Sequence, residues 1–233
     1  MVLKGAPQCR TDYKGRSKGE SNSTWGQRNL LGRMVKVLKK RIIVGMSGAS
    51  AVVYGIRALA HLRGMEDVES HLVMSKGART VIRLESEYKA EEVEAMADVV
   101  HRPDDLAAPV SSGSFKTDGM VVIPCSVKSL SGIVHSYADN LLTRAADVCL
   151  KEKRKLVLVV RETPLHKGHL ELMVKAADLG ATVLPPVPAF YHKPRTIEDL
   201  VDHTVGKVFD CLDLDHRLFL RWGENGATGM ERS

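Results

Sequence analysis

The chain has 233 residues, of which 44% are hydrophobic, and a formal net charge of +6. That length suffices for one domain with a full core, and no apolar run approaches the ~18–20 residues of a membrane span, so a soluble globular protein is expected. Eleven of the 34 basic but only two of the 28 acidic residues lie in residues 1–41. The remainder is therefore mildly acidic, which disfavours nucleic-acid binding by the folded part.

Residues 1–40 are rich in Gly, Ser, Lys and Arg and lack sustained hydrophobic periodicity. We expect most of this segment to be disordered. It could be a targeting segment, an arm for nucleic acid or a membrane surface, or an upstream extension without function. We favour the third explanation, with Met34 as the natural start and a cytoplasmic protein. A transit peptide would instead place the protein in mitochondria.

Residues 41–46 form a short apolar run typical of a buried parallel strand, and Ser47-Gly48-Ala49-Ser50 follows as a turn of small residues. From Val52 the apolar residues recur at helical spacing. Such a turn leaves helix N–H groups unpaired, which suits a phosphate, and the hydroxyls of Ser47 and Ser50 favour that interpretation. The glycines do not form the G-x-G-x-x-G dinucleotide pattern, so a tight turn without a ligand stays an alternative.

Predicted strands and helices alternate along the rest of the chain. We expect strands over residues 70–74, 120–124, 155–160 and 181–184, and helices from residue 77 to about 84 and over 90–97, 141–153, 166–179 and 196–212. A loop of small residues is expected over 107–115. The alternation predicts an α/β protein with an open, mostly parallel sheet and helices on both faces. One domain would span residues 41–213, followed by a C-terminal tail over 214–233.

Polar residues follow several of these strands, at the edge where parallel sheets bind ligands. They are Ser50, Ser75, Ser126, Arg161-Glu162 and the loop before Tyr191. This convergence predicts a ligand site. Arg161 would bind a phosphate beside a carboxyl group, Glu162, that can transfer a proton. The alternative for the pair is a salt bridge that fixes the following loop.

Four further residues are candidates. Arg144 and Lys151 share one helix face and could bind a second phosphate, although pairing with Asp147 and Glu152 explains them equally well. Glu85 is a second carboxylate at a helix junction, and taken alone it would be solvated. Tyr191 and Trp222 stand out among few aromatic residues; either packs in the core or a lid, or offers a face to a cation.

Metal and nucleophile chemistry are disfavoured. His166, His169 and His192 have no supporting acidic cluster, and no Ser-His-Asp order with a nucleophile elbow occurs. The four cysteines lie far apart without a C-x-x-C pair, which argues against a zinc site or a disulfide framework and fits a reducing compartment. They are Cys9, Cys125, Cys149 and Cys211.

Seven segments carry a family resemblance: VGMSGAS (44–50), HLVMSKGAR (71–79), SSGSF (111–115), IPCSVKSLSGI (123–133), RAADVCLKEKRKLVLVVRETPLH (144–166), PPVPAFYHKP (185–194) and RW (221–222). In this order they resemble the UbiX-type flavin prenyltransferases, which were formerly described as components of aromatic-acid decarboxylases. That family belongs to the homo-oligomeric flavin-containing Cys decarboxylases. The resemblance covers about residues 41–222, whereas the preceding segment has no counterpart.

The resemblance implies a flavodoxin-like domain that forms trimers and then a dodecamer. It implies a metal-independent transferase that takes reduced FMN and a short prenyl phosphate, chiefly dimethylallyl phosphate. The prenyl unit would be joined to N5 and C6 of the flavin. The product, prenylated FMN, would serve a UbiD-type decarboxylase, and both ubiquinone synthesis and phenolic-acid degradation stay open as pathways.

The resemblance also implies site residues. FMN would contact Gly48, Ala49, Ser50, Ser75, Ser126, Val127, Lys128, Ser129 and Arg161. The prenyl phosphate would contact Arg144, Lys151, Arg161, Tyr191 and Lys207. Many family members have Arg in place of Lys207, and lysine keeps the charge but not the bidentate geometry. The catalytic set would be Glu162 as proton donor and acid/base, Glu85 in support, Ser50, and Trp222 over the allylic cation.

Two other functions on the same fold stay open. One is an FMN-dependent decarboxylase acting on a cysteine, although the loop reads PCSVKS where those enzymes have an Asn-containing PASANT-like sequence. The other is a carrier that binds FMN for a partner decarboxylase without catalysis. A nucleic-acid module is third.

Overall fold

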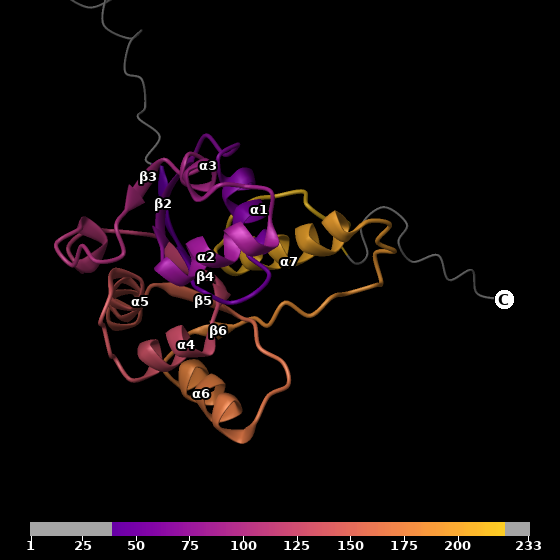
Figure 1. The fold of residues 1–233 in the computed structure, drawn as a ribbon. Helices are drawn as coiled ribbons and strands as arrows, with labels where there is room; N and C mark the ends of the chain where they lie inside the picture. Colours follow the sequence, from indigo (N-terminus) through magenta and orange to yellow (C-terminus); the bar gives the residue numbers. More distant parts are fainter. Residues whose placement is uncertain (1–38, 222–233) are drawn as a thin grey trace, which may run out of the picture. The chain divides into compact units, whose positions relative to one another are not determined.

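The computed structural model describes residues 39–221, which form a six-stranded sheet in the order β3-β2-β1-β4-β5-β6 (Figure 1). All neighbouring strands pair in parallel. The strands are β1 (Lys40–Met46), β2 (Val68–Met74), β3 (Val99–His101), β4 (Gly119–Cys125), β5 (Lys155–Val160) and β6 (Thr182–Val183). Apart from the three-residue edge strand β3, the order is that of flavodoxin-like folds. The predicted fold class is confirmed.

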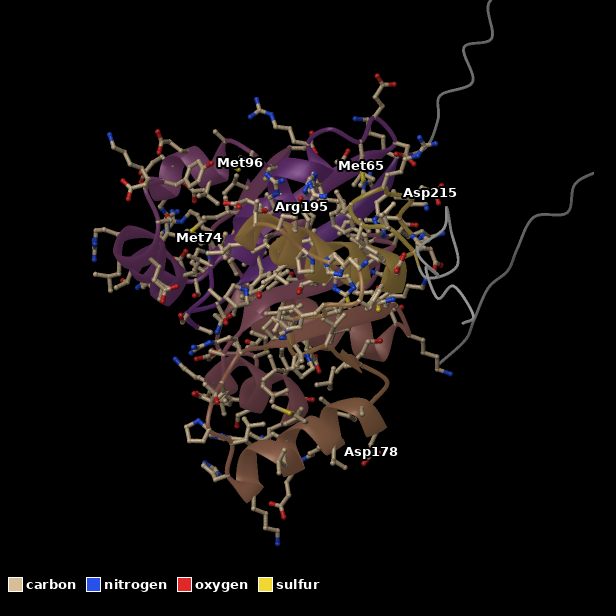
Figure 2. The ribbon with its side chains drawn as sticks, turned by 90° about the vertical axis from the view of Figure 1, so that its right-hand side faces the viewer. Met65, Met74, Met96, Asp178, Arg195 and Asp215 are labelled. Carbon is tan, nitrogen blue, oxygen red and sulfur yellow. The ribbon has the colours of Figure 1, made fainter. Side chains whose placement is uncertain are left out.

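Helices cover both faces of the sheet (Figure 1). They are α1 (Val53–Leu62), α2 (Lys76–Glu85), α3 (Ala90–Glu94), α4 (Val127–Val134), α5 (Leu141–Lys151), α6 (Lys167–Asp178) and α7 (Ile197–Cys211), with a short 3-10 turn at Pro109–Ser111. One face packs against α1, α2, α3 and α7, and the other against α4, α5 and α6. Figure 2 shows Met65, Met74 and Met96 on the α7 side and Asp178, at the end of α6, on the other.

The central strand β1 divides the core into two layers. Ile42 and Val44 face the α1/α7 layer while Ile43 faces the α4/α5/α6 layer, and all three are at most 1% exposed. This alternation follows from the two-residue period of a strand. Burying each such side chain contributes about 1.5–3 kcal/mol, so the strand that carries the first candidate loop is a rigid support.

Two elements were not predicted. The strand β3 has only three residues and pairs at the sheet edge with β2, so the sequence contains too short an apolar run to indicate it. The helix α4 directly follows Ser126, whose side chain accepts a hydrogen bond from the Ser129 amide as an N-cap. Its apolar residues Leu130, Ile133 and Val134 have helical spacing, but Ser and Gly between them obscure the signal.

The predictions for residues 1–38 and for Trp222 and the rest of the tail lie outside the described residues. Within residues 39–221 no helix combines the length and the hydropathy that a bilayer crossing requires.

Candidate active site

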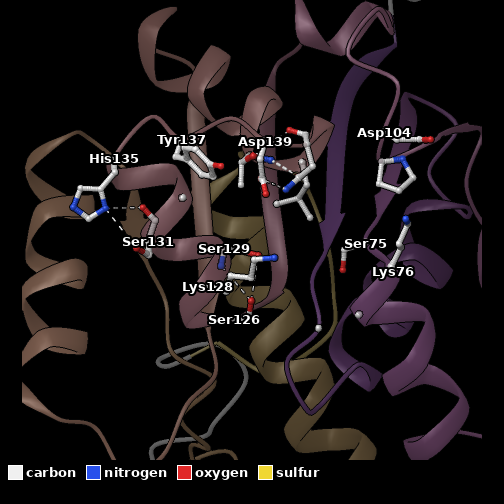
Figure 3. Close-up of a pocket in the computed structure, with 17 residues that line it drawn as sticks. Ser75, Lys76, Asp104, Ser126, Lys128, Ser129, Ser131, His135, Tyr137 and Asp139 are labelled. Carbon is white, nitrogen blue, oxygen red and sulfur yellow. Dashed lines mark hydrogen bonds between the residues drawn. The ribbon is translucent and has the colours of Figure 1, made fainter.

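A cleft of about 1010 Å³ lies at the carboxyl ends of the adjacent strands β2, β1 and β4. Figure 3 shows Ser75 and Lys76, at the start of α2, facing Ser126, Lys128 and Ser129, at the start of α4. Gly48 lines it from the β1–α1 turn, and Pro103, Asp104 and eight of the residues between 131 and 143 complete the wall. Of the strand-end residues that were predicted to converge, Ser75 and Ser126 meet in this cleft, whereas Ser50, Arg161, Glu162 and Tyr191 do not line it.

The floor of the cleft is bare backbone. A Cβ atom on Gly48 would lie 3.0 Å from Cα of Gly77, and one on Gly77 would lie 3.1 Å from Cα of Gly48. Ordinary carbon–carbon contacts are about 3.5–4.0 Å. Only glycine at both positions lets the two turns meet and leaves their peptide groups open to a ligand.

Two helix N-termini and two lysines bring positive charge to one part of the cleft, although Asp104 and Asp139 also line it. Ser75 accepts a hydrogen bond from the Ala78 amide at 3.1 Å and Ser126 accepts one from the Ser129 amide at 3.3 Å, so each caps a helix whose N-terminus faces the cleft. Two helix dipoles thus add to the ammonium groups of Lys76 and Lys128. This arrangement suits the phosphate of a nucleotide such as FMN, and the residues present therefore fit that group.

Five of the nine residues expected at FMN line the cleft. They are Gly48, Ser75, Ser126, Lys128 and Ser129. Ala49 is 8% exposed and faces the core, while Ser50, Val127 and Arg161 lie outside the lining. Lys76 and Gly77 also line the cleft and were not predicted. They directly follow Ser75 after a strand, and this position could have indicated them.

The prediction that the Ser47 hydroxyl contacts a phosphate is wrong. The residue is 1% exposed. Its hydroxyl donates to the carbonyl of Pro124 at 2.8 Å and accepts from the amide of Ser126 at 2.7 Å. Both hydrogen bonds join the ends of β1 and β4. Ser47 therefore stabilises the two strand ends that carry the cleft and does not line it.

Glu85 lies at the end of α2 and reaches back to the β1–α1 turn. Its Oε2 accepts a hydrogen bond from the Ala51 amide at 2.7 Å. Ala51 has a φ of 71°, a left-handed conformation that is strained for alanine, and no side chain from the N-cap position of α1 bonds the first turn. Glu85 therefore stabilises the turn that carries Gly48, which a solvated side chain would not do.

Arg161 and Glu162 follow β5 at the same edge. The Arg161 amide donates to the carbonyl of Cys125 at 3.0 Å, which places the pair beside the β4–α4 loop. Glu162 is exposed, and its Oε1 accepts from the Thr163 amide at 3.0 Å. Neither side chain forms an ion pair within residues 39–221. The alternative of a loop-fixing salt bridge is therefore wrong for this part of the chain.

Arg144 and Lys151 each have an acidic partner close by on α5 or just after it, and Lys151 lies far from Arg161 within one chain. Arg144 pairs with Asp147 at 3.0 Å and Lys151 pairs with Glu152, the partners of the structural alternative. Lys151 ends α5 just before β5 begins, whereas Arg161 follows the end of β5. At 3.3 Å per residue the strand separates their backbones by about 20 Å.

Tyr191 and Lys207 form a third group along α7. The hydroxyl of Tyr191 lies 2.9 Å from Nε2 of His203, and Lys207, one helical turn after His203, pairs with Asp210 at 3.2 Å. Tyr191 is 43% exposed. His203 was not predicted as a site residue, because a lone histidine on a helix carries no motif.

The buried cysteines have no thiolate character. Burial raises the pKa of Cys125 to about 12. Burial likewise raises the pKa of Cys149 to about 12, outweighing the charge of Arg154 and a hydrogen bond to Thr117. Since the thiolate is the reactive form, neither group is a nucleophile near neutral pH.

Comparisons with known proteins agree with this geometry. The flavoprotein family model matches residues 33–209. The flavin prenyltransferase UbiX of Salmonella typhimurium is 60% identical over 185 residues, which cover 78% of this chain and 98% of the relative. The matched regions include the strand ends that build the cleft.

Solved structures extend the comparison. A crystal structure of AnUbiX (PadA1) in complex with FMN and dimethylallyl pyrophosphate is 52% identical, with a TM-score of 0.77 over 79% of this chain and 97% of that chain. A dodecameric FMN-dependent UbiX-like decarboxylase from Escherichia coli O157:H7 is 55% identical, with a TM-score of 0.74 over 76% and 96%. The FMN-dependent cysteine decarboxylase SpaF is 19% identical, with a TM-score of 0.53 over 64% and 85%, a likeness that shows the fold alone.

Proposed function

This chain belongs to the flavoprotein family and, within it, to the UbiX flavin prenyltransferases, and we propose that it joins a dimethylallyl unit from dimethylallyl phosphate to N5 and C6 of reduced FMN. The observation that carries the proposal is the cleft at the ends of β1, β2 and β4. There the close contact of Gly48 with Gly77 and two capped helix N-termini offer backbone donors and positive charge to a phosphate.

Bound FMN would supply the nucleophilic ring atoms, and the chain would supply binding and proton transfer. Breaking the carbon–oxygen bond of the allyl phosphate would let its carbon bond to N5, with phosphate leaving with the electron pair and N5 losing its proton. Ring closure at C6 would then need a proton added to the prenyl double bond and the C6 proton removed. We assign Arg161 to the departing phosphate and Glu162 to proton donation. The Glu162 carboxylate is available for this role, because it meets only the neighbouring Thr163 amide within residues 39–221. A cation and an acid at the developing charge lower the barrier.

Arg144 and Lys151 complete the prenyl phosphate site from a second copy of the chain in this proposal. Within one chain the length of β5 separates Lys151 from Arg161. A dodecameric relative supports an assembly. So does α6, in which Ala176 alone is fully buried while Leu170 and Val174 are 49% and 61% exposed. An apolar helix face of this kind is typical of an interface between protein chains.

Mixed oligomers test that arrangement. Lys151→Ala and Arg161→Ala should each abolish prenylation alone. Co-expressed in equal amounts they should restore about one quarter of wild-type activity, because one site in four then draws the intact residue from each copy. Mixed oligomers that stay as inactive as the single variants would mean that both residues act within one chain.

Anaerobic incubation with reduced FMN and either dimethylallyl phosphate or the pyrophosphate, followed by mass spectrometry of the flavin, tests the reaction. A flavin heavier by one prenyl unit is expected with the monophosphate. Glu162→Gln should retain FMN but lose most of the product. FMN that binds and stays unmodified in the wild-type protein would identify a carrier instead.

Other features of the proposal depend on the family. We propose that a UbiD-type decarboxylase receives the product in the cytoplasm, and that residues 41–213 form the catalytic domain between the N-terminal extension and the C-terminal tail. Co-purification of the product with such a decarboxylase, and prenylation by a variant that lacks residues 1–33, test these points.

A further inference from the structure

His203 lies in the middle of α7 and is 7% exposed. Its Nε2 lies 2.9 Å from the hydroxyl of Tyr191, which comes from the long connection between β6 and α7. We propose that His203 is a positioning residue that holds the Tyr191 hydroxyl toward the prenyl phosphate. The inference deepens the proposed function and rests on it.

Aromatic contacts hold the imidazole of His203 from two sides. The ring of His192 stacks on it with a centroid distance of 4.8 Å and an interplanar angle of 6°. The ring of Phe219 lies at 4.7 Å. Phe219 can approach because residue 206 is glycine, since a Cβ there would lie 2.5 Å from its ring. A ring packed in this way has one orientation, and so does the hydrogen bond it makes.

The segment that carries Tyr191 has no regular secondary structure to fix the position of this side chain. The connection from Leu184 to Thr196 contains no helix or strand, and the residues before Tyr191 include Val187 and Phe190, which are 71% and 67% exposed. Prolines stiffen this segment, but they remove amide donors that could anchor it. The side chain of Tyr191 itself is close to half exposed. Its hydrogen bond to His203 therefore ties the hydroxyl to the rigid helix α7.

The charge state of His203 suits this role. Burial lowers its pKa, electrostatic interactions with His192 and Lys207 lower it further, and Asp210 opposes them. His203 is therefore neutral near pH 7, and one ring nitrogen carries a proton. When that nitrogen is Nε2, it donates to the Tyr191 oxygen and leaves the phenolic O–H to donate to a phosphate oxygen. A charged imidazole would also repel Lys207.

Packing alone does not explain His203. Both ring nitrogens of His192 are buried and make no hydrogen bond within residues 39–221, so that residue contributes by stacking. His203 differs because its Nε2 forms a hydrogen bond with the side chain of Tyr191, which belongs to another segment. A phenylalanine at position 203 would stack equally well and would save the cost of burying a polar ring.

A double-mutant cycle tests the proposal in the full-length protein. His203→Phe keeps the stacked ring and removes Nε2, whereas Tyr191→Phe removes the hydroxyl. Losing one hydrogen bond of ordinary strength should raise the KM for dimethylallyl phosphate about 5- to 10-fold. The KM for reduced FMN should stay within twofold. The double variant should be no worse than Tyr191→Phe, and His203→Gln, which restores a donor, should recover part of the loss.

A control separates this role from general damage. His61→Phe changes a half-buried histidine on α1 that bonds Asp202 and should leave both KM values unchanged. The inference is overturned if His203→Phe matches wild type or if the two single effects simply multiply. Calorimetric binding of dimethylallyl phosphate gives a second readout. If the wild-type protein binds this ligand but makes no prenylated flavin, the proposed function fails while the comparison of binding between wild type and His203→Phe still decides the inference.

Discussion

Substituting Gly48 by alanine tests the central feature of the cleft. The new Cβ would lie 3.0 Å from Cα and 3.1 Å from the carbonyl carbon of Gly77. Ordinary contacts are about 3.5–4.0 Å, and both partners are backbone atoms, so the β1–α1 turn and the start of α2 must part by about 0.5 Å. Overpacking of this size costs about 1–3 kcal/mol. A cost of about 2 kcal/mol on binding corresponds to roughly 30-fold weaker FMN affinity.

Quenching of flavin fluorescence measures this affinity directly. Gly48→Ala and Gly77→Ala should weaken FMN binding to a similar extent, because each methyl group enters the same gap from one side. Gly64→Ala is the matched control, since its Cβ would meet only the His61 carbonyl at 3.4 Å, an ordinary contact. Affinity of Gly48→Ala within twofold of Gly64→Ala would refute the placement of FMN against this backbone.

The remaining predictions concern the supports of the site. Glu85→Ala should lower the unfolding midpoint by about 2–4 °C through loss of the hydrogen bond to Ala51, worth about 1 kcal/mol at this exposed position, while Glu87→Ala should have no effect in the same melt. Burial acts to raise the pKa of Asp210, but hydrogen bonds from Arg221, His216 and Lys207 prevail and hold it at about 2. Because that pKa lies below the unfolded value near 4, the contribution of about 2 kcal/mol is present at neutral pH and disappears as pH falls from about 4 toward 2. Denaturant titrations should therefore show a smaller acid-side loss of stability for Asp210→Asn than for wild type.

The sequence predicted the sheet and the edge that carries the site. Apolar runs mark β1, β4 and β5, because strands buried on both faces have continuous hydrophobic sequences, and the residues after parallel strands meet at one edge. Ser47 could not be assigned from sequence. Its hydroxyl is no different chemically from that of Ser50, and only the neighbouring end of β4 shows that it is used internally. The link between Glu85 and Ala51 is likewise tertiary, joining residues 34 positions apart.

The position of Lys151 follows from topology more than from residue type. In a parallel α/β unit a helix begins at the carboxyl edge of the sheet and ends at the amino edge, where the next strand starts. A cation in the last turn of α5 therefore faces the opposite end of the domain from Arg161, whatever its helical face. Helical spacing places Lys151 and Arg144 on one helix face but contains no information on which edge of the sheet either residue reaches.

The lining of the cleft and the separation of Lys151 from Arg161 together indicate which steps one copy of the chain can carry out. The cleft proposed for FMN is lined by residues of one chain, from the turns after β1, β2 and β4, the segment after β3 and the region of α4 and α5. Two of the cations assigned to the prenyl phosphate, Lys151 and Arg161, lie at opposite ends of β5, and no side-chain movement closes a gap of about 20 Å when an extended lysine spans about 6 Å. A single copy is therefore expected to bind FMN without prenylating it. Assembly would then be a requirement of the chemistry as well as of stability, and dilution or interface variants that yield monomers should lose product formation before they lose flavin binding.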